Sequence, residues 1–428
     1  MKHWFITILT LSCLLSCGDE GSVLSEEGDG QAIVKEITVA KGTRADDTTD
    51  EEILTSNTFG KKSILYVSQL GNEMETNFKP GFPITDTPEE ILENLYPYEW
   101  YDNPNNPTWD NDEYNFKAIN PANVINWNTI KRNGSVGNAF WLYAMYFPED
   151  QKIKFNVEAD QRGTDQKDIS NFKKSDIMGA YHATSSLYSP LRFRLFHLMV
   201  YLKVTLYVPV YSSYNSGGES GYSGFKKGDL KDVYVMNANT DFKIEWRANR
   251  SSDTEAPLTQ PDGAKKNIFM YRHEADEDQT QCLDVSNYYT GNFIGVCKCK
   301  KEESVPCDDC QCECCKEGGN PSACKCDEVR VYNFSVLFPA QSFGVKDKIL
   351  CFPLNLPDTD GNIKYYYFSS SQIIGGTNEN YSLTQGTLQH LHLYLPRTTN
   401  ETILIGAKIL PWKDAFTDMT MTEQTEQD

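Results

Sequence analysis

The residues best suited to chemistry are cysteines, nine of which lie in the segment 297–326. Their spacings (C-x-C, C-x-x-C, C-x-C-x-C-C and C-x-C) could wrap several thiolates around one soft ion such as zinc or copper. The same thiols could form disulfides with cysteines on a facing segment, or stay largely reduced. We favour disulfides, because the chain carries an export signal at its N-terminus. The nine residues are Cys297, Cys299, Cys307, Cys310, Cys312, Cys314, Cys315, Cys324 and Cys326.

Two histidines, His390 and His392, alternate with leucines in the stretch QHLHL. Residues two apart in a strand share a face, so this pair could bind a metal or could mark the polar face of a strand. We favour the polar face. The chain has no Gly-Lys-Ser/Thr phosphate loop and no Gly-x-Ser-x-Gly elbow, and its many carboxylates cannot be assigned as acid and base without geometry. The sequence therefore predicts a protein that is not an enzyme and needs no cofactor.

The net charge of −20 makes nucleic acid an unsuitable partner, because phosphate backbones would repel the chain. The first residues form a short positive region and an apolar run, typical of a secretory signal. The run ends in Leu-Leu-Ser-Cys, which resembles a bacterial lipobox and implies that Cys17 is lipidated, with acyl chains such as palmitate. We therefore expect a signal peptide at 1–16, a lipidated acidic tether at 17–30, and attachment to the outer membrane at the cell surface.

Composition and patterning favour β-structure, since the 24 Tyr and 21 Phe fit half-buried sheet surfaces. Short alternating segments recur along the chain, starting with a first strand within 32–42 and including a hairpin turn at 358–362. The longest alternation covers 191–211 and slips near 196–199, which indicates a bulge or two consecutive strands. The proline-rich region 77–128 reads instead as irregular. Within it, the stretch DTPEEILENLY predicts one short helix, with Pro at its first turn.

In this order, the features resemble the fimbrillins, the pilin-like lipoproteins of type V pili in Bacteroidetes. The resemblance rests on the lipobox, on EITVAKGTRADD, on FWLYAMYFPEDQKIKF, on SDIMGAYHATS followed by LRFRLFHLMVYLKVTLYV, and on IKYYYF, LTQGTLQHLHLYLP and AKILPW near the end. The connector and strand are the most specific part: Asp176 leads the connector, and His197 follows an aromatic residue in the strand. We expect His197 to be a packed, structural histidine.

The resemblance implies an all-β chain with two tandem β-sandwich domains of transthyretin-like topology. We place them at 31–180 and 181–428. The Pro-rich region 77–128 and the Cys-rich segment 297–326 depart from the family pattern and are expected to be loop insertions.

The resemblance also implies how such a subunit assembles. An arginine-specific protease would cut between Arg44 and Ala45, the first strand would be lost, and a strand of the next subunit would fill the groove. An uncut anchor subunit would keep its lipid.

The expected function is a tip or accessory pilus subunit in adhesion. Its partners would be other fimbrillin-like subunits, the outer membrane through the lipid, and a host or bacterial surface ligand. Two alternatives stay open. One is a surface glycan-binding lipoprotein that uses Trp100, Tyr101, Trp109 and Trp127, although these aromatics could equally pack against their own domain. The other is a metal-sequestering surface protein built on the Cys-rich segment.

Overall fold

The computed structural model describes residues 34–40, 63–69, 95–101, 113–126, 140–148, 153, 155–163, 170–184, 191–210, 225–245, 258–273, 281–284, 296–297, 326–355, 362–374, 380–395 and 402–411. Within these ranges the prediction of an almost entirely β-stranded chain is confirmed, with two short helices, α1 (Ser170–Lys174) and α2 (Ser371–Ile374). None of the described helices is long and apolar enough to cross a membrane. The tandem transthyretin-like arrangement stays a prediction.

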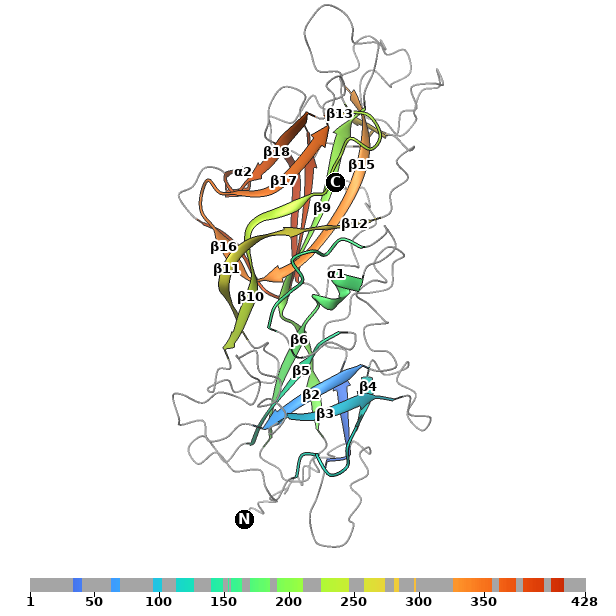
Figure 1. The fold of residues 1–428 in the computed structure, drawn as a ribbon, viewed down its shortest axis with the longest axis vertical. Helices are drawn as coiled ribbons and strands as arrows, with labels where there is room; N and C mark the ends of the chain where they lie inside the picture. The colour runs from blue at the N-terminus through green and yellow to red at the C-terminus, as the bar shows by residue number, and fades with distance from the viewer. Residues whose placement is uncertain are drawn as a thin grey trace, which may run out of the picture.

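The first half of the chain builds an eight-stranded sheet, at the lower end of the molecule in Figure 1. Its order is β7-β1-β4-β3-β2-β5-β6-β8. Neighbouring strands are antiparallel, apart from the parallel pair β1 and β7. The strands are β1 (Glu36–Ala40), β2 (Ile64–Gln69), β3 (Leu95–Trp100), β4 (Glu113–Ala118), β5 (Phe140–Tyr146), β6 (Met178–Thr184), β7 (Arg192–Arg194) and β8 (Phe196–His197).

The proline-rich region differs from its prediction as irregular loop. It supplies β3 and β4, which lie between β1 and β2 within the sheet. Most of the expected helix, residues 86–94, lies outside the described residues, and its last two residues, Leu95 and Tyr96, begin β3. Strand pairing overrides the local helix signal there, because Leu95 is 1% exposed and belongs to the hydrophobic core. Pro97 contributed to the prediction of a loop, but this proline lies within β3, opposite Tyr66 of β2.

The rest of the chain forms two larger sheets and a small one. The four-stranded sheet has the order β11-β10-β17-β18, and the seven-stranded sheet the order β14-β13-β15-β9-β20-β21, with β12 also paired to β15. Strands β16 and β19 pair with each other. The strands are β9 (Met199–Pro209), β10 (Tyr234–Glu245), β11 (Leu258–Phe269), β12 (Tyr271–Arg272), β13 (Gln281–Asp284), β14 (Val296–Cys297), β15 (Cys326–Pro339), β16 (Gln341–Phe343), β17 (Lys348–Asn355), β18 (Ile363–Ser369), β19 (Tyr381–Leu383), β20 (Thr387–Tyr394) and β21 (Ile403–Pro411).

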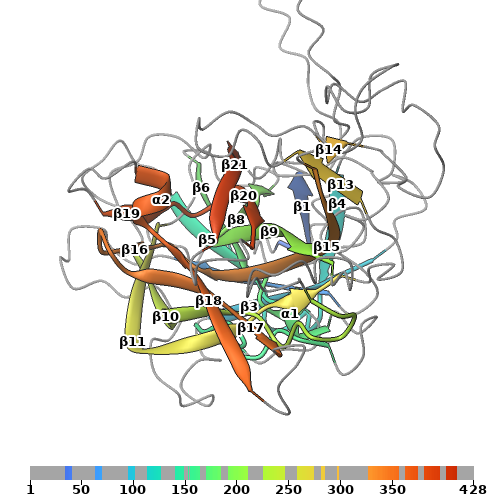
Figure 2. The same cartoon turned by 90° about the horizontal axis from the view of Figure 1, so that it is seen from above.

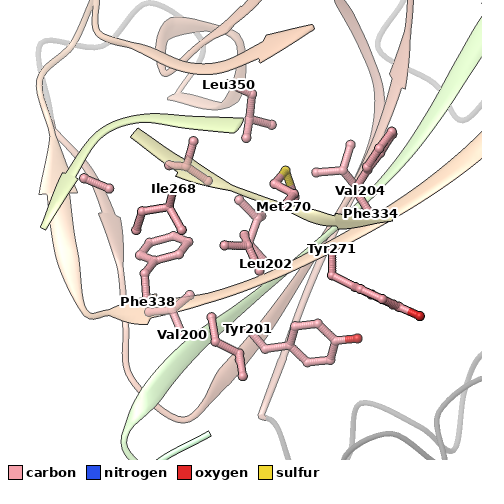
Figure 3. Packing of buried hydrophobic residues seen from close by; sticks show 14 of the residues in the cluster. Val200, Tyr201, Leu202, Val204, Ile268, Met270, Tyr271, Phe334, Phe338 and Leu350 are labelled. Atoms are coloured by element: carbon pink, nitrogen blue, oxygen red, sulfur yellow. The ribbon is translucent and has the colours of Figure 1, made fainter. Parts of the chain in front are cut away.

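The two larger sheets lie as layers around one core. Seen from above, β10, β11 and β17 form one layer beside β9, β15 and β20 (Figure 2). Between the layers, Leu202 and Phe338 approach Ile268 and Leu350, and all four are buried (Figure 3). The period-2 alternation of β9 explains this packing, since every second side chain faces the opposite sheet. The antiparallel pairing of β17 with β18 agrees with the hairpin expected at 358–362, of which residues 358–361 lie outside the described part of the chain.

The chain passes from one sheet to the other at Leu198. Strands β7 and β8 belong to the eight-stranded sheet, whereas β9 belongs to the seven-stranded sheet. The slip in the sequence pattern near 196–199 is therefore a change of sheet between consecutive strands. Both β7 and β8 lie after residue 180, where the sequence placed the domain boundary; that boundary stays a prediction.

Candidate functional site

The first strand, β1, lies between two neighbours. It pairs antiparallel with β4, where Ile37 stands opposite Phe116. On its other side it pairs in parallel with β7, where Val39 stands opposite Phe193. Because β1 lies between β4 and β7, removing it would take away the strand paired with β7 and expose the main-chain hydrogen-bonding groups of β4.

The side chains of this first segment are deeply buried. Val34, Ile37 and Val39 are 5%, 1% and 0% exposed and belong to the smaller of the two hydrophobic clusters. Burying one such side chain contributes roughly 1.5–3 kcal/mol, so the three together contribute about 5–9 kcal/mol. The burial of these three side chains therefore helps to hold the first segment in the sheet.

A buried tyrosine fastens the segment just before β1. The Tyr98 hydroxyl donates a hydrogen bond to the Val34 carbonyl at 2.9 Å and accepts one from the Ile125 N–H at 3.3 Å. The Val34 N–H in turn donates to the Ile125 carbonyl at 2.8 Å. Burial raises the pKa of Tyr98 above its ordinary value, so the phenol stays protonated and can donate. The sequence reading missed Tyr98, because it lies in the region taken as irregular.

A second buried polar contact lies at the change of sheet. Asp176 and His197, which the sequence analysis noted separately, join through a carboxylate oxygen and Nδ1 at 2.6 Å. Both side chains are 2% exposed. Next to them, the Leu198 N–H donates to the Ile177 carbonyl at 3.0 Å. His197 is thus placed as a packed histidine, and its partner is now identified.

The segment 155–161 connects with both of the larger sheets. Asn156 forms a bridge with Asp241 of β10, and Asp160 forms one with Phe269 of β11. The buried amide of Gln161 donates to the Leu337 carbonyl of β15 at 2.6 Å and accepts from the Leu337 N–H at 2.9 Å. One side chain thereby satisfies both backbone groups of a buried strand residue.

His390 and His392 lie side by side on β20, with ring centroids 4.2 Å apart. His390 Nε2 is 2.8 Å from the Thr205 hydroxyl, and the His392 ring stacks on Tyr207. Burial, together with the charge of Lys203, lowers the pKa of His392 to about 4, so it is neutral at ordinary pH. Within the described ranges, no group of three or more His, Cys, Asp or Glu side chains is arranged to hold a metal ion.

Other predicted residues fall mostly outside the described part of the chain. Trp100 ends β3 and packs against the smaller core cluster, and Lys117 lies 5.5 Å above the Tyr101 ring. Of the nine clustered cysteines, the two at the ends are described: Cys297 ends β14, and Cys326 begins β15. The predicted residues outside the described ranges are Cys17, Arg44, Ala45, Trp109, Trp127, Cys299, Cys307, Cys310, Cys312, Cys314, Cys315 and Cys324.

No protein-family model and no curated protein matches this chain. Its structure is similar to solved fimbrial and candidate cell adhesion proteins of Bacteroidetes, at low identity. One is a candidate cell adhesion protein from Bacteroides uniformis, 11% identical, with 90% of this chain and 100% of that chain covered and a TM-score of 0.41. Another is the tip fimbrial protein Mfa3 from Porphyromonas gingivalis, 8% identical, with coverages of 88% and 100% and a TM-score of 0.34. A fimbrial assembly protein from Parabacteroides distasonis is 10% identical, with coverages of 89% and 100% and a TM-score of 0.30.

Proposed function

We propose that this chain is a non-enzymatic, surface-exposed, fimbrillin-like pilus subunit that assembles by β-strand exchange. The observation that carries the proposal is the position of β1. It is a short strand with buried apolar side chains, it lies between β4 and a parallel β7, and it ends at Ala40, four residues before Arg44. A cut after Arg44 would divide the chain just beyond the strand that fills the groove.

The exchange step follows from the physics of sheet edges. Once the chain is cut, β1 is held only by its own hydrogen bonds and by the burial of residues such as Ile37 and Val39. An incoming strand with apolar side chains at alternate positions can make the same main-chain bonds and fill the same pockets. Such a strand from the next subunit would dissociate more slowly than β1 if it pairs over more than the five residues of β1.

In this proposal the signal peptide 1–16 directs export, and Cys17 anchors the acidic tether to the outer membrane. Cutting after Arg44 leaves the lipidated fragment bound through β1, and displacement of β1 by the incoming strand then releases the subunit from the lipid and opens the groove. The Cys-rich segment 297–326 departs from an ordinary stalk subunit, so we assign the chain a tip or accessory position in adhesion. Its partners are other fimbrillin-like subunits and a ligand on a host or bacterial surface.

The test uses the exported chain treated with an arginine-specific protease. We expect an SDS-resistant ladder of oligomers and a new N-terminus at Ala45. The matched control is Arg44→Ala, which should stay uncut at this position and unassembled. A chain that is cut after Arg44 yet forms no SDS-resistant oligomers would overturn the exchange mechanism.

A further inference from the structure

Two cysteines far apart in the sequence occupy directly opposed positions in the seven-stranded sheet. Strand β13 lies between β14 and β15. In the antiparallel pair of β13 and β14, Cys282 stands opposite Cys297, and Leu283 stands opposite Val296. On the other side of β13, Asp284 stands opposite Cys326. Both ends of the Cys-rich segment are therefore held next to the strand that carries Cys282.

The pairing register distinguishes between Cys297 and Cys326, the two cysteines that the described strands place beside Cys282. Directly opposed residues of antiparallel strands have Cα atoms about 4.5 or 5.5 Å apart, and both values fall within the range of roughly 4.4–6.8 Å that a disulfide spans. Cys326 is instead a diagonal neighbour, because Cys282 itself stands opposite Glu328. Diagonal Cα separations are about 7–8 Å, which is beyond the reach of a disulfide without backbone movement.

We propose that Cys282 and Cys297 form a cross-strand disulfide in the exported protein. The two thiols lose two protons and two electrons as the S–S bond forms. The electron acceptor is a protein disulfide of an exchange catalyst, which takes up the two electrons and two protons and becomes a dithiol. The oxidising compartment rests on the proposed surface location, whereas the choice of partner rests on the register alone.

This bond would fasten the base of the Cys-rich segment. Strand β14 ends the seven-stranded sheet and has only two residues, so its pairing with β13 is short. A covalent link at Cys297 holds that edge strand in register at the point where the segment leaves the sheet. At the other end, Cys326 begins β15, a fourteen-residue strand that is anchored through β9. Both ends of the Cys-rich segment would then be anchored in the sheet, whether its inner cysteines form disulfides, bind a metal or stay reduced.

The mass of one tryptic peptide shows directly whether this disulfide is present. Trypsin cuts after Arg272 and Lys298, so one peptide, 273–298, contains Cys282 and Cys297 and no other cysteine. The full chain is exported to the periplasm of a bacterial host, alkylated without reductant and digested. We expect the peptide to be unalkylated and lighter by two hydrogens than the dithiol, and to take up two alkyl groups after reduction.

Three results would overturn the proposal. They are alkylation of either cysteine before reduction, a cross-link from this peptide to another, and protection at full dithiol mass that a metal chelator removes. Cys326→Ser and Cys351→Ser serve as controls and should leave the peptide 273–298 unchanged, because one residue is diagonal and the other is buried in β17. The mass of the peptide 273–298 can be measured whether or not the chain is cut at Arg44. A result against the disulfide therefore leaves the proposed function untouched, and the reverse also holds.

Discussion

The carboxylate of Asp176 lies 2.6 Å from Nδ1 of His197, and the two side chains are buried where the chain leaves one sheet for the other. Asp176 precedes β6, and His197 ends β8, which pairs with β6. The contact therefore ties the start of one strand to the last residue of another, directly before β9 enters the second core. A buried polar pair of this kind fixes one arrangement, because either group alone would be left without its partner.

Breaking this pair should destabilise the fold strongly. Asp176→Ala removes the carboxylate that bonds buried His197, for which we expect a loss of about 1–3 kcal/mol in the free energy of unfolding. Urea titration measures it. In a double-mutant cycle with His197→Ala, the two losses should be coupled by at least about 0.5 kcal/mol.

The matched control is Asp160→Asn, which weakens an ion pair with Arg162 on the surface, where the two side chains are 52% and 35% exposed. Asp160→Asn should lower the free energy of unfolding by no more than about 1 kcal/mol. Equal losses for Asp176→Ala and Asp160→Asn, or additive losses in the cycle, would contradict the structural role of the buried pair.

Tyr98→Phe should loosen the start of the first strand. The substitution removes one hydroxyl that bonds both the Val34 carbonyl and the Ile125 N–H. Leaving these buried groups unsatisfied should lower the free energy of unfolding by about 1–3 kcal/mol and speed the hydrogen exchange of the β1 amides. Tyr365→Phe, at a side chain that is 42% exposed, is the control and should change neither quantity. Unchanged exchange of the β1 amides in Tyr98→Phe would show that this hydroxyl does not hold the strand.

Gln161→Met should weaken the attachment of the segment 155–161 to β15. The methionine fills a similar volume but offers no amide to the Leu337 N–H and carbonyl. We expect a loss of about 1–3 kcal/mol, since both backbone groups stay buried. The midpoint of urea unfolding measures this, and a variant as stable as the parent would mean that other groups satisfy Leu337.

Stability should fall between about pH 6.5 and pH 4 because of two histidines. Burial, aided by the charge of Lys203, lowers the pKa of His273 and of His392 from 6.5 to about 4. Above pH 6.5 both histidines are neutral in the folded and in the unfolded chain, so they do not change the free energy of unfolding. Below pH 6.5 the histidines of the unfolded chain become protonated while those of the folded chain stay neutral, so the free energy of unfolding falls. This decrease is complete below about pH 4. Each histidine contributes up to about 3 kcal/mol to this loss.

Substituting these two histidines tests the pH dependence. His392 stacks on Tyr207, and His273 Nε2 lies 2.7 Å from the Ser335 hydroxyl, so glutamine replaces each ring with a neutral polar group. The free energy of unfolding of His273→Gln/His392→Gln, measured against pH, should decline less steeply than that of the parent between pH 6.5 and pH 4. Parallel curves would contradict the assignment of this loss to the two histidines.

The sequence predicts much of the strand pattern, because alternation is a local property of the chain. The slip near Leu198 marked the change of sheet, and the run of β9 was visible residue by residue. Strand β3 was missed, since Pro97 and the flanking polar residues give a local loop signal while burial between β2 and β4 decides the outcome. Local propensity is a weak guide when pairing on both sides favours a strand.

The contacts within the candidate site were beyond the reach of sequence reasoning for a different reason. Asp176 and His197 are separated by 21 residues, and Tyr98 is separated from Val34 by 64. Cys282 and Cys297 become neighbours only through the register of β13 with β14. Spacing along the chain shows which residues could react, but the strand pairing decides which of them meet.

The most direct test of strand exchange locks β1 in place. Glu36 and Lys117 are exposed and stand opposite each other in the antiparallel pair of β1 and β4, so Glu36→Cys/Lys117→Cys can cross-link without disturbing the core. The measurement is the SDS-resistant ladder after cutting at Arg44, with the cross-link closed and after its reduction. The single variants and the parent, with and without reductant, are the controls. Strand exchange predicts that the locked chain is cut yet stays monomeric until the cross-link is reduced; an equal ladder with the lock closed would contradict it.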